Sequence, residues 1–246
     1  MRGLQAKPYL QSIRADYGPG VDLDDFPYCV PAVRELRQLD FHADVTFFVG
    51  ENGSGKSTVL EAVALALGFG IEGGTINNTL LNTARAGSTL KDQLKLARSF
   101  RRPRDGYFLR AESFYNVATY IDEMPGSTGY GDRKLHDRSH GEAFMTVLLE
   151  KFRGRGLYLL DEPEAALSPN RQLAALSAIH QLVRQESQFI IVTHSPILLA
   201  YPNARIYCFD ATGITDMAYE DTEHYAVTRD FLNHYPRRLE QLFAED

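Results

Sequence analysis

The chain has 246 residues, of which 44% are apolar, and its formal net charge is −6. These values suit one sizeable globular core and argue against a wholly basic nucleic-acid-binding coat, while a local basic patch stays open. Two distant cysteines, Cys29 and Cys208, form no CxxC pair, which argues against a disulfide framework and a zinc site. The amino terminus lacks an apolar signal core, and no apolar run approaches the ~18 residues of a membrane span. The sequence therefore predicts a soluble, cytoplasmic protein.

The first half of the chain alternates apolar runs with glycine-rich turns. Strands are expected at 8–14, 33–41, 44–50 and 107–114. Apolar residues dominate the strand at 44–50, which predicts that it is buried. A helix is expected at 57–70, because its apolar residues have helical spacing and end abruptly at two glycines. The Gly/Asn-rich segment 71–89 predicts a loop with a helical turn, and the charged segment 90–106 has no clear assignment before its final turn.

The second half of the chain alternates helical periods with short apolar strands. Strands are expected at 156–163, at 188–196 and within 204–219, where a turn at Thr212 and Gly213 divides one or two strands. Helices are expected at 140–156, 169–187 and 223–243, the last amphipathic and broken near Pro236. Because apolar strands alternate with helices, the sequence predicts an α/β fold with a mainly parallel sheet flanked by helices.

A phosphate-binding loop is indicated by Gly50, Gly55, Lys56 and Ser57, which fit the pattern Gly-x4-Gly-Lys-Ser/Thr between a strand and a helix. Glycines allow successive N–H groups to face an anion, and the start of the helix adds its positive end. Lys56 is expected to reach the β- and γ-phosphates, and the Ser57 hydroxyl to bind Mg²⁺. A glycine-rich turn with an ordinary surface lysine is the alternative. The residues expected to contact nucleotide are Glu51, Asn52, Gly53, Ser54, Gly55, Lys56, Ser57 and Thr58.

Two further buried strands deliver polar residues to their carboxyl ends, where open α/β sheets bind ligands. Asp161 and Glu162 end the strand at 156–163, and His194 ends the strand at 188–196. Asp161 is expected to hold Mg²⁺, while Glu162 would act as the general base toward water. An imidazole at His194 would reach a γ-phosphate. The alternatives are an acidic loop after a strand and a structural histidine.

The segments GENGSGKST, LLDEPEAALSP and VTHSP occur in this order, and together they resemble the ATP-binding-cassette (ABC) ATPases. The closer resemblance is to the branch that contains the SMC, Rad50 and RecF proteins and standalone AAA-family ATPases. It implies a P-loop NTPase fold, in the form of an ABC ATPase-like head with antiparallel strands at the amino terminus. In that branch two heads enclose the nucleotide, so the resemblance implies an ATP-dependent homodimer that uses Mg²⁺.

The resemblance also implies a signature segment in RSHGEAFMTVLL, at 138–149, just before the acidic strand. Ser139, Gly141 and Glu142 match S-x-G-E, and His140 departs from the usual glycine. A serine and helix-start N–H groups would contact a γ-phosphate presented by a partner chain, whereas the alternative is an ordinary helix cap. The D-loop of the family corresponds to 165–168, where its usual final aspartate is a serine. Glu112 occupies the region of the Q-loop but is not glutamine, and no adenine-stacking aromatic residue is apparent.

Only about 80 residues separate Ser57 from Ser139, without sustained heptads, so the long coiled coils of SMC and Rad50 are absent. The sequence predicts a bare head: one ATPase domain over 1–246, with a helical and signature subregion at about 75–150 and a helical tail at about 221–246. Two basic stretches, 98–104 and 151–155, are interpreted as solvated surface in preference to DNA contacts.

Three functions are compatible with these features. The favoured one is an ATP-driven dimerising switch that acts with nucleic acid or an effector protein in genome maintenance or defence. The S-x-G-E signature favours it over the alternative, the ATPase subunit of a membrane transporter, whose family members more often carry SGGQ. A regulatory module that hydrolyses nothing is disfavoured by Glu162, a catalytic carboxylate. No NKxD motif for guanine recognition is apparent, which argues against a small GTPase.

Overall fold

The computed structural model describes residues 7–75, 89–110 and 139–244, and its main element is a seven-stranded sheet in the order β10-β9-β3-β8-β7-β6-β4. The strands are β3 (Val45–Gly50), β4 (Gly74–Thr75), β6 (Asp105–Arg110), β7 (Gly156–Asp161), β8 (Gln188–Val192), β9 (Arg205–Asp210) and β10 (Gly213–Met217). β9, β3, β8, β7 and β6 run parallel, while β10 and β4 pair antiparallel at the two edges. The predicted α/β fold with a mainly parallel sheet is confirmed.

A second, antiparallel sheet covers part of one face. It has the order β2-β1-β5, from β1 (Leu10–Ala15), β2 (Gln38–Asp40) and β5 (Leu94–Arg98). Two of its strands come from the first 40 residues, which confirms the predicted antiparallel strands at the amino terminus. β5 comes from the charged segment at 90–106, which the sequence left unassigned.

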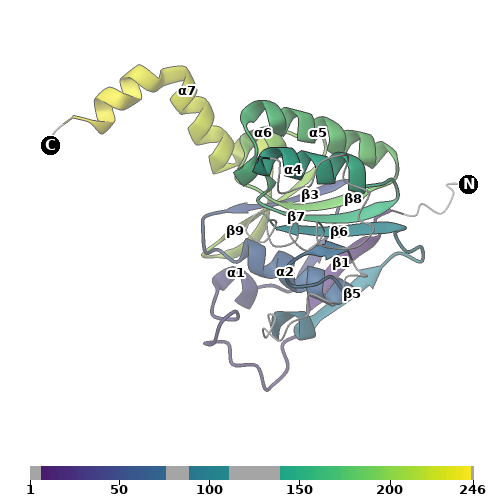
Figure 1. The fold of residues 1–246 in the computed structure, drawn as a ribbon. Coiled ribbons are helices and arrows are strands. Elements are labelled where there is room, and N and C mark those ends of the chain that lie inside the picture. Colours follow the sequence, from purple (N-terminus) through teal and green to yellow (C-terminus); the bar gives the residue numbers. More distant parts are fainter. Residues whose placement is uncertain (1–6, 76–88, 111–138, 245–246) are drawn as a thin grey trace, which may run out of the picture.

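Helices cover both faces of the large sheet (Figure 1). On one face lie α1 (Pro31–Arg34) and α2 (Lys56–Leu67), and on the other lie α4 (His140–Thr146), α5 (Pro169–Arg184) and α6 (Pro196–Leu199). Single turns are η2 (Thr89–Gln93), η5 (Pro163–Ala166) and η6 (Tyr219–Asp221), and a π-helical turn, η4 (Val147–Lys151), continues α4. The last helix, α7 (Glu223–Leu242), extends away from the body toward the carboxyl terminus (Figure 1).

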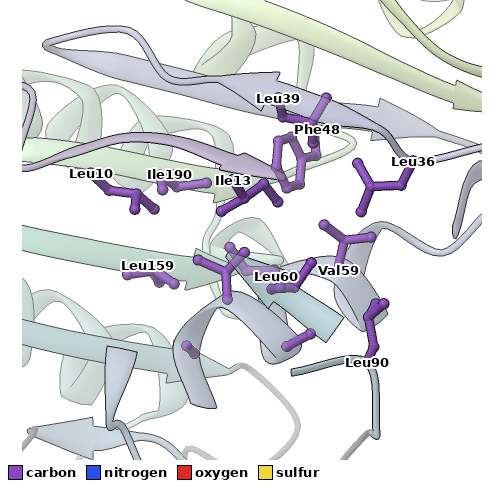
Figure 2. Packing of buried hydrophobic residues seen from close by; sticks show 14 of the residues in the cluster. Leu10, Ile13, Leu36, Leu39, Phe48, Val59, Leu60, Leu90, Leu159 and Ile190 are labelled. Carbon is purple, nitrogen blue, oxygen red and sulfur yellow. The ribbon is translucent and has the colours of Figure 1, made fainter. Parts of the chain in front are cut away.

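The core is divided by the sheet because neighbouring residues of a strand face opposite ways. In β7, Tyr158 and Leu160 belong to the cluster beneath α4 and α5, whereas Leu157 and Leu159 belong to the cluster with α2 and the antiparallel sheet. Figure 2 shows the second cluster, where Phe48 of β3 packs among side chains of β1, β2 and α2. Two packed faces explain why the central strands consist of nearly continuous apolar residues.

Three expectations for secondary structure were wrong in part. The strand expected at 33–41 is confined to β2, because Pro31 at the first helical position starts the short helix α1 through Arg34. The helix expected at 140–156 ends at Lys151, where Phe152 becomes extended and enters the core. Within the expected loop 71–89, Gly74–Thr75 forms β4 by pairing with β6, a long-range contact that local sequence does not indicate.

The carboxyl-terminal helix behaves as its sequence indicates. α7 is kinked at His234, two residues before Pro236, whose ring restricts the preceding backbone. None of its residues is buried, and Val227, Leu232 and Leu242 are strongly exposed. Among the described residues, no helix combines the length and the apolar character needed to cross a membrane.

Candidate functional site

The loop between β3 and α2 has the backbone geometry of an anion cradle. Gly50 and Gly55 have φ angles of 136° and 97°, which side chains disfavour. A Cβ atom at Gly50 would also lie 2.2 Å from the carbonyl oxygen of Phe209, so β9 approaches too closely for any other residue. Gly55 forms the N-cap of α2, which places the start of that helix against the loop.

Lys56 lies buried inside this loop. Its Nζ donates hydrogen bonds to the carbonyl oxygens of Gly50, at 2.8 Å, and Glu51, at 2.7 Å. Burial lowers the pKa of Lys56, and the carboxylates of Glu162 and Asp161 oppose that shift. The ammonium is therefore directed to the centre of the cradle, where an anion would find both the charge and the loop N–H groups.

Ser57 and Asp161 meet across the edge of the sheet. The Ser57 hydroxyl donates to Oδ1 of Asp161 over 2.8 Å, although the residues are 104 positions apart. Oδ2 of Asp161 lies 3.6 Å from Nε of Arg110, whose Nη1 pairs with Glu61 at 2.6 Å. A hydroxyl beside a carboxylate is a pair of hard oxygen donors that suits Mg²⁺ with water and phosphate as its other ligands. No group of three or more His, Cys, Asp or Glu residues that could hold a metal ion occurs in the described ranges.

Glu162 follows directly after β7 in a left-handed backbone conformation, with φ of 51°. Its N–H donates to the carbonyl oxygen of Val192 over 3.0 Å, which fixes this turn against β8. The carboxylate is partly exposed, and its Oε1 lies 3.6 Å from Nε2 of His194. A side chain held at such a turn points out from the sheet edge, where it can reach a water molecule.

A second carboxylate, Glu164, holds the segment that carries His194. Its Oε2 accepts a hydrogen bond from the Thr193 hydroxyl at 2.7 Å, and its Oε1 accepts one from the His194 N–H at 2.5 Å. Burial raises the pKa of Glu164 despite these bonds. Sequence reasoning did not single out Glu164, although the run D-E-P-E shows a further acidic residue two positions after Glu162.

His224 was also missed by sequence reasoning. It lies in the first turn of α7, and its Nε2 is 2.8 Å from Nδ1 of His194. Burial lowers the pKa of His194, and the Lys56 charge lowers it further, while Glu162 opposes the shift. The pKa of His224 is lowered as well, by burial and then by His194. Nothing in the local sequence around His224 indicates this pairing.

A cavity of about 620 Å³ opens beside the phosphate loop, between the turn after β9 and the start of α7. Its lining includes the loop residues Gly50, Glu51, Asn52, Gly53 and Ser54 together with Asp210, Asp221 and His224. A cavity of this size is within the range of small-molecule sites. The predicted loop residues from Glu51 to Ser54 therefore face a space that a ligand can enter.

The predicted signature residues lie elsewhere. Ser139 and Glu142 form a reciprocal capping box at the start of α4, which is the alternative role weighed from the sequence. Arg171 of α5 donates to both side chains, at 3.2 and 3.1 Å. A Cβ atom at Gly141 would lie 2.5 Å from the carbonyl oxygen of Ala166, so this glycine lets α4 approach η5.

The structure thus brings together the loop that ends at Thr58 with Asp161, Glu162 and His194, and leaves Ser139 on α4. α4 packs on the face opposite α2, as Figure 1 shows. The D-loop candidate at 165–168 joins η5 to the start of α5, where Ser168 is the N-cap. The Q-loop candidate Glu112 lies outside the described residues.

Comparisons with known proteins identify the family of this chain. The profile of a family described as "AAA domain" matches residues 29–155, just over half of the chain. The "ABC transporter G family member STR2" of Medicago truncatula is 25% identical over 174 residues, which are 62% of this chain and 24% of that protein. The chain therefore spans about a quarter of the length of this curated relative.

A solved structure with a similar fold is known. CbiO1 of Clostridium perfringens, described as part of the ABC transporter complex cbiONQ, superimposes with a TM-score of 0.51 at 14% identity, covering 96% of this chain and 99% of that one. The SMC head domain from Thermotoga maritima gives a TM-score of 0.46 at 14% identity, covering 85% and 99%. Because the family profile matches just over half of the chain, the chain belongs to the AAA domain family, and its fold is the one seen in the ABC-transporter protein CbiO1.

Proposed function

We propose that this chain, as one domain over 1–246, binds ATP with Mg²⁺, hydrolyses it, and works as a switch in which two chains close around the nucleotide. One observation carries the proposal. Lys56, the Ser57–Asp161 pair at 2.8 Å, and the Glu162–His194 pair at 3.6 Å converge at one edge of the sheet beside the phosphate loop. Phosphoryl transfer to water needs a cation, metal ligands, a general base and a contact to the γ-phosphate, and these residues would supply them.

Each residue has a distinct task in this proposal. The loop N–H groups and Lys56 bind the β- and γ-phosphates. Ser57 and Asp161 would hold Mg²⁺, which would supply positive charge that offsets the phosphate charge. Glu162 takes a proton from water as the water oxygen bonds to the γ-phosphorus, and the bond to the bridging oxygen breaks with its electron pair leaving on ADP. Nε2 of His194 contacts the γ-phosphate oxygen.

The position of the signature residues supports the dimer. Because α4 packs on the face opposite α2, we assign Ser139, Gly141 and Glu142 to the nucleotide of a second chain. The Ser139 hydroxyl accepts hydrogen bonds from Glu142 and Arg171 and keeps its proton to donate to a phosphate oxygen. Two identical chains related by a two-fold axis would then share two sites.

Glu162→Gln tests the catalytic role. The amide keeps the size of the side chain but accepts no proton, so phosphate release should fall about 10²–10⁴-fold while ATP still binds. Glu186→Gln is a matched control, because Glu186 is also a glutamate in the left-handed region, with φ of 65°, and pairs with Arg155 on the surface. Turnover at the wild-type rate in Glu162→Gln would show that another group activates the water.

A mixing experiment tests the shared site. Lys56→Met chains and Ser139→Arg chains should each be inactive, since one lacks the loop cation and the other blocks the signature. In a mixed dimer one composite site is intact, so equal mixing should restore about a quarter of the wild-type rate when chains assort randomly. Mixed dimers that form without restoring turnover would overturn the shared site.

The transporter alternative has one observation in its favour, the 25% identity to a protein named as an ABC transporter family member. An ATPase subunit of that kind would co-purify with membranes at its natural abundance, whereas the proposed switch would co-purify with nucleic acid or an effector protein. Stimulation of ATP hydrolysis by DNA or RNA that weakens steeply with added salt would select a nucleic-acid client.

A further inference from the structure

A second histidine, His224 of α7, contacts the His194 ring nitrogen Nδ1. This Nδ1 lies 2.8 Å from Nε2 of His224, with ring centroids 5.0 Å apart and planes inclined by 53°. His224 is itself fixed, because it lies in the first turn of α7, next to its buried N-cap Thr222. The Thr222 hydroxyl accepts from the N–H of Tyr225 and donates to the carbonyl oxygen of Tyr219.

A hydrogen bond between two imidazole nitrogens contains a single proton. One ring donates an N–H and the other accepts with its lone pair, so the bond determines which nitrogen of each neutral ring is protonated. If His194 accepts at Nδ1, its own proton is on Nε2. If it donates from Nδ1, Nε2 carries a lone pair, which repels any anion that approaches.

The surroundings of Nε2 decide between these two arrangements. This nitrogen of His194 is buried, has no hydrogen-bond partner among the described residues, and lies 3.6 Å from Oε1 of Glu162. A carboxylate at that position favours a proton on Nε2 over a lone pair. Burial and the nearby ammonium of Lys56 disfavour a second proton on the ring, so the pairing must set the tautomer of a neutral imidazole.

We propose that His224 is a positioning residue: it donates its Nε2–H to Nδ1 of His194 and thereby holds His194 with its proton on Nε2, facing the nucleotide. The catalytic consequence rests on the proposed ATPase function, because the contact of that proton would be a γ-phosphate oxygen. The arrangement resembles the way in which a second hydrogen-bonded group fixes the ring and tautomer of functional histidines elsewhere.

The tautomer can be measured without nucleotide. Long-range ¹H–¹⁵N spectra of the full chain labelled at its histidine nitrogens distinguish a protonated ring nitrogen from one with a lone pair, and His194→Gln identifies the signals. Wild type should show His194 protonated on Nε2. His224→Met, which offers no donor, should raise the fraction protonated on Nδ1, whereas His224→Gln, whose side-chain amide offers an N–H, should preserve the wild-type state.

Kinetics provide the second readout. His224→Met should lower kcat about 10-fold with less than about a 2-fold change in KM, and His224→Gln should restore kcat to within about 3-fold of wild type. His180→Gln is the control, since His180 pairs with the Tyr201 hydroxyl away from this site. A merely structural role of His224 would not separate methionine from glutamine in this way.

The outcomes separate this inference from the proposed function. His194 protonated on Nδ1 in wild type, or a tautomer and kcat that His224→Met leaves unchanged, would overturn the positioning role even in an active ATPase. Conversely, the expected spectra in a protein that hydrolyses no ATP would overturn the proposed function and leave the histidine pairing established.

Discussion

Lys56→Met separates the binding role of the lysine from any role in folding. In the structure Lys56 is 4% exposed, and its ammonium donates to the carbonyl oxygens of Gly50 and Glu51. Methionine has a similar length and fills the same space without the charge. Glu51 is exposed and Gly50 is partly exposed, so water can satisfy their carbonyl groups after the substitution. We therefore expect the free energy of unfolding to change by less than about 1 kcal/mol.

Nucleotide affinity should respond far more strongly than stability. Hydrogen bonds to charged groups contribute about 1.5–3 kcal/mol each, so contacts with the β- and γ-phosphates together amount to about 3–6 kcal/mol. That range corresponds to an affinity about 10²–10⁴-fold weaker. Burial of the ammonium enlarges the effect, because its charge is screened less by solvent than a surface charge.

The assay is titration calorimetry with ATP and Mg²⁺, accompanied by urea unfolding of the same preparations. Lys95→Met is the matched control, since Lys95 is an exposed lysine on β5 that pairs with Asp16 in the antiparallel sheet. Its nucleotide affinity should equal that of wild type. An unchanged affinity in Lys56→Met, with folding intact, would refute the assignment of this loop as the phosphate cradle.

Two more perturbations follow from particular contacts. Gly141→Ala places a methyl group 2.5 Å from the carbonyl oxygen of Ala166, so it should destabilise the chain by about 1–3 kcal/mol in urea unfolding, whereas Gly18→Ala, with no atom near its Cβ, should not. Folding lowers the pKa values of His194 and His224. At pH values near and below ~6.5 these two histidines therefore bind more protons in the unfolded chain than in the folded chain. Stability should therefore fall on acidification from pH ~7.5 to ~5.5, and less steeply in His224→Gln; a fall of equal size in both proteins would contradict the histidine assignment.

The parts of the site that sequence could predict are those encoded by local spacing. The loop from Gly50 to Ser57 has a fixed spacing that only certain backbone angles satisfy, and Asp161 ends a run of apolar residues. Their meeting at 2.8 Å follows from the parallel sheet, because carboxyl ends of parallel strands share one edge. His194 was predictable for the same reason.

Other parts depend on contacts between distant segments. His224 meets His194 because α7 begins where the chain returns from β10, a placement that no local pattern encodes. β5 mixes apolar residues with lysine and arginine in a charged stretch, and its pairing partner β1 lies about 80 residues earlier. The start of the segment at 33–41 has β-forming residues, but Pro31 begins a helical turn that includes Val33.

Short hydrogen bonds to neutral groups already hold Lys56 and Asp161 at the sheet edge, and this determines what binding and turnover each require. Lys56 is held by loop carbonyls and Asp161 by the Ser57 hydroxyl, so a triphosphate and its metal would replace weaker partners by stronger ones with little loss of side-chain freedom. Nucleotide binding can therefore be strong in a single chain. Turnover differs, because Ser139 lies at the start of α4, and α4 packs on the face of the sheet opposite α2. There the Ser139 hydroxyl accepts a hydrogen bond from Arg171. We infer that the single chain retains ATP and that pairing of two chains controls its hydrolysis.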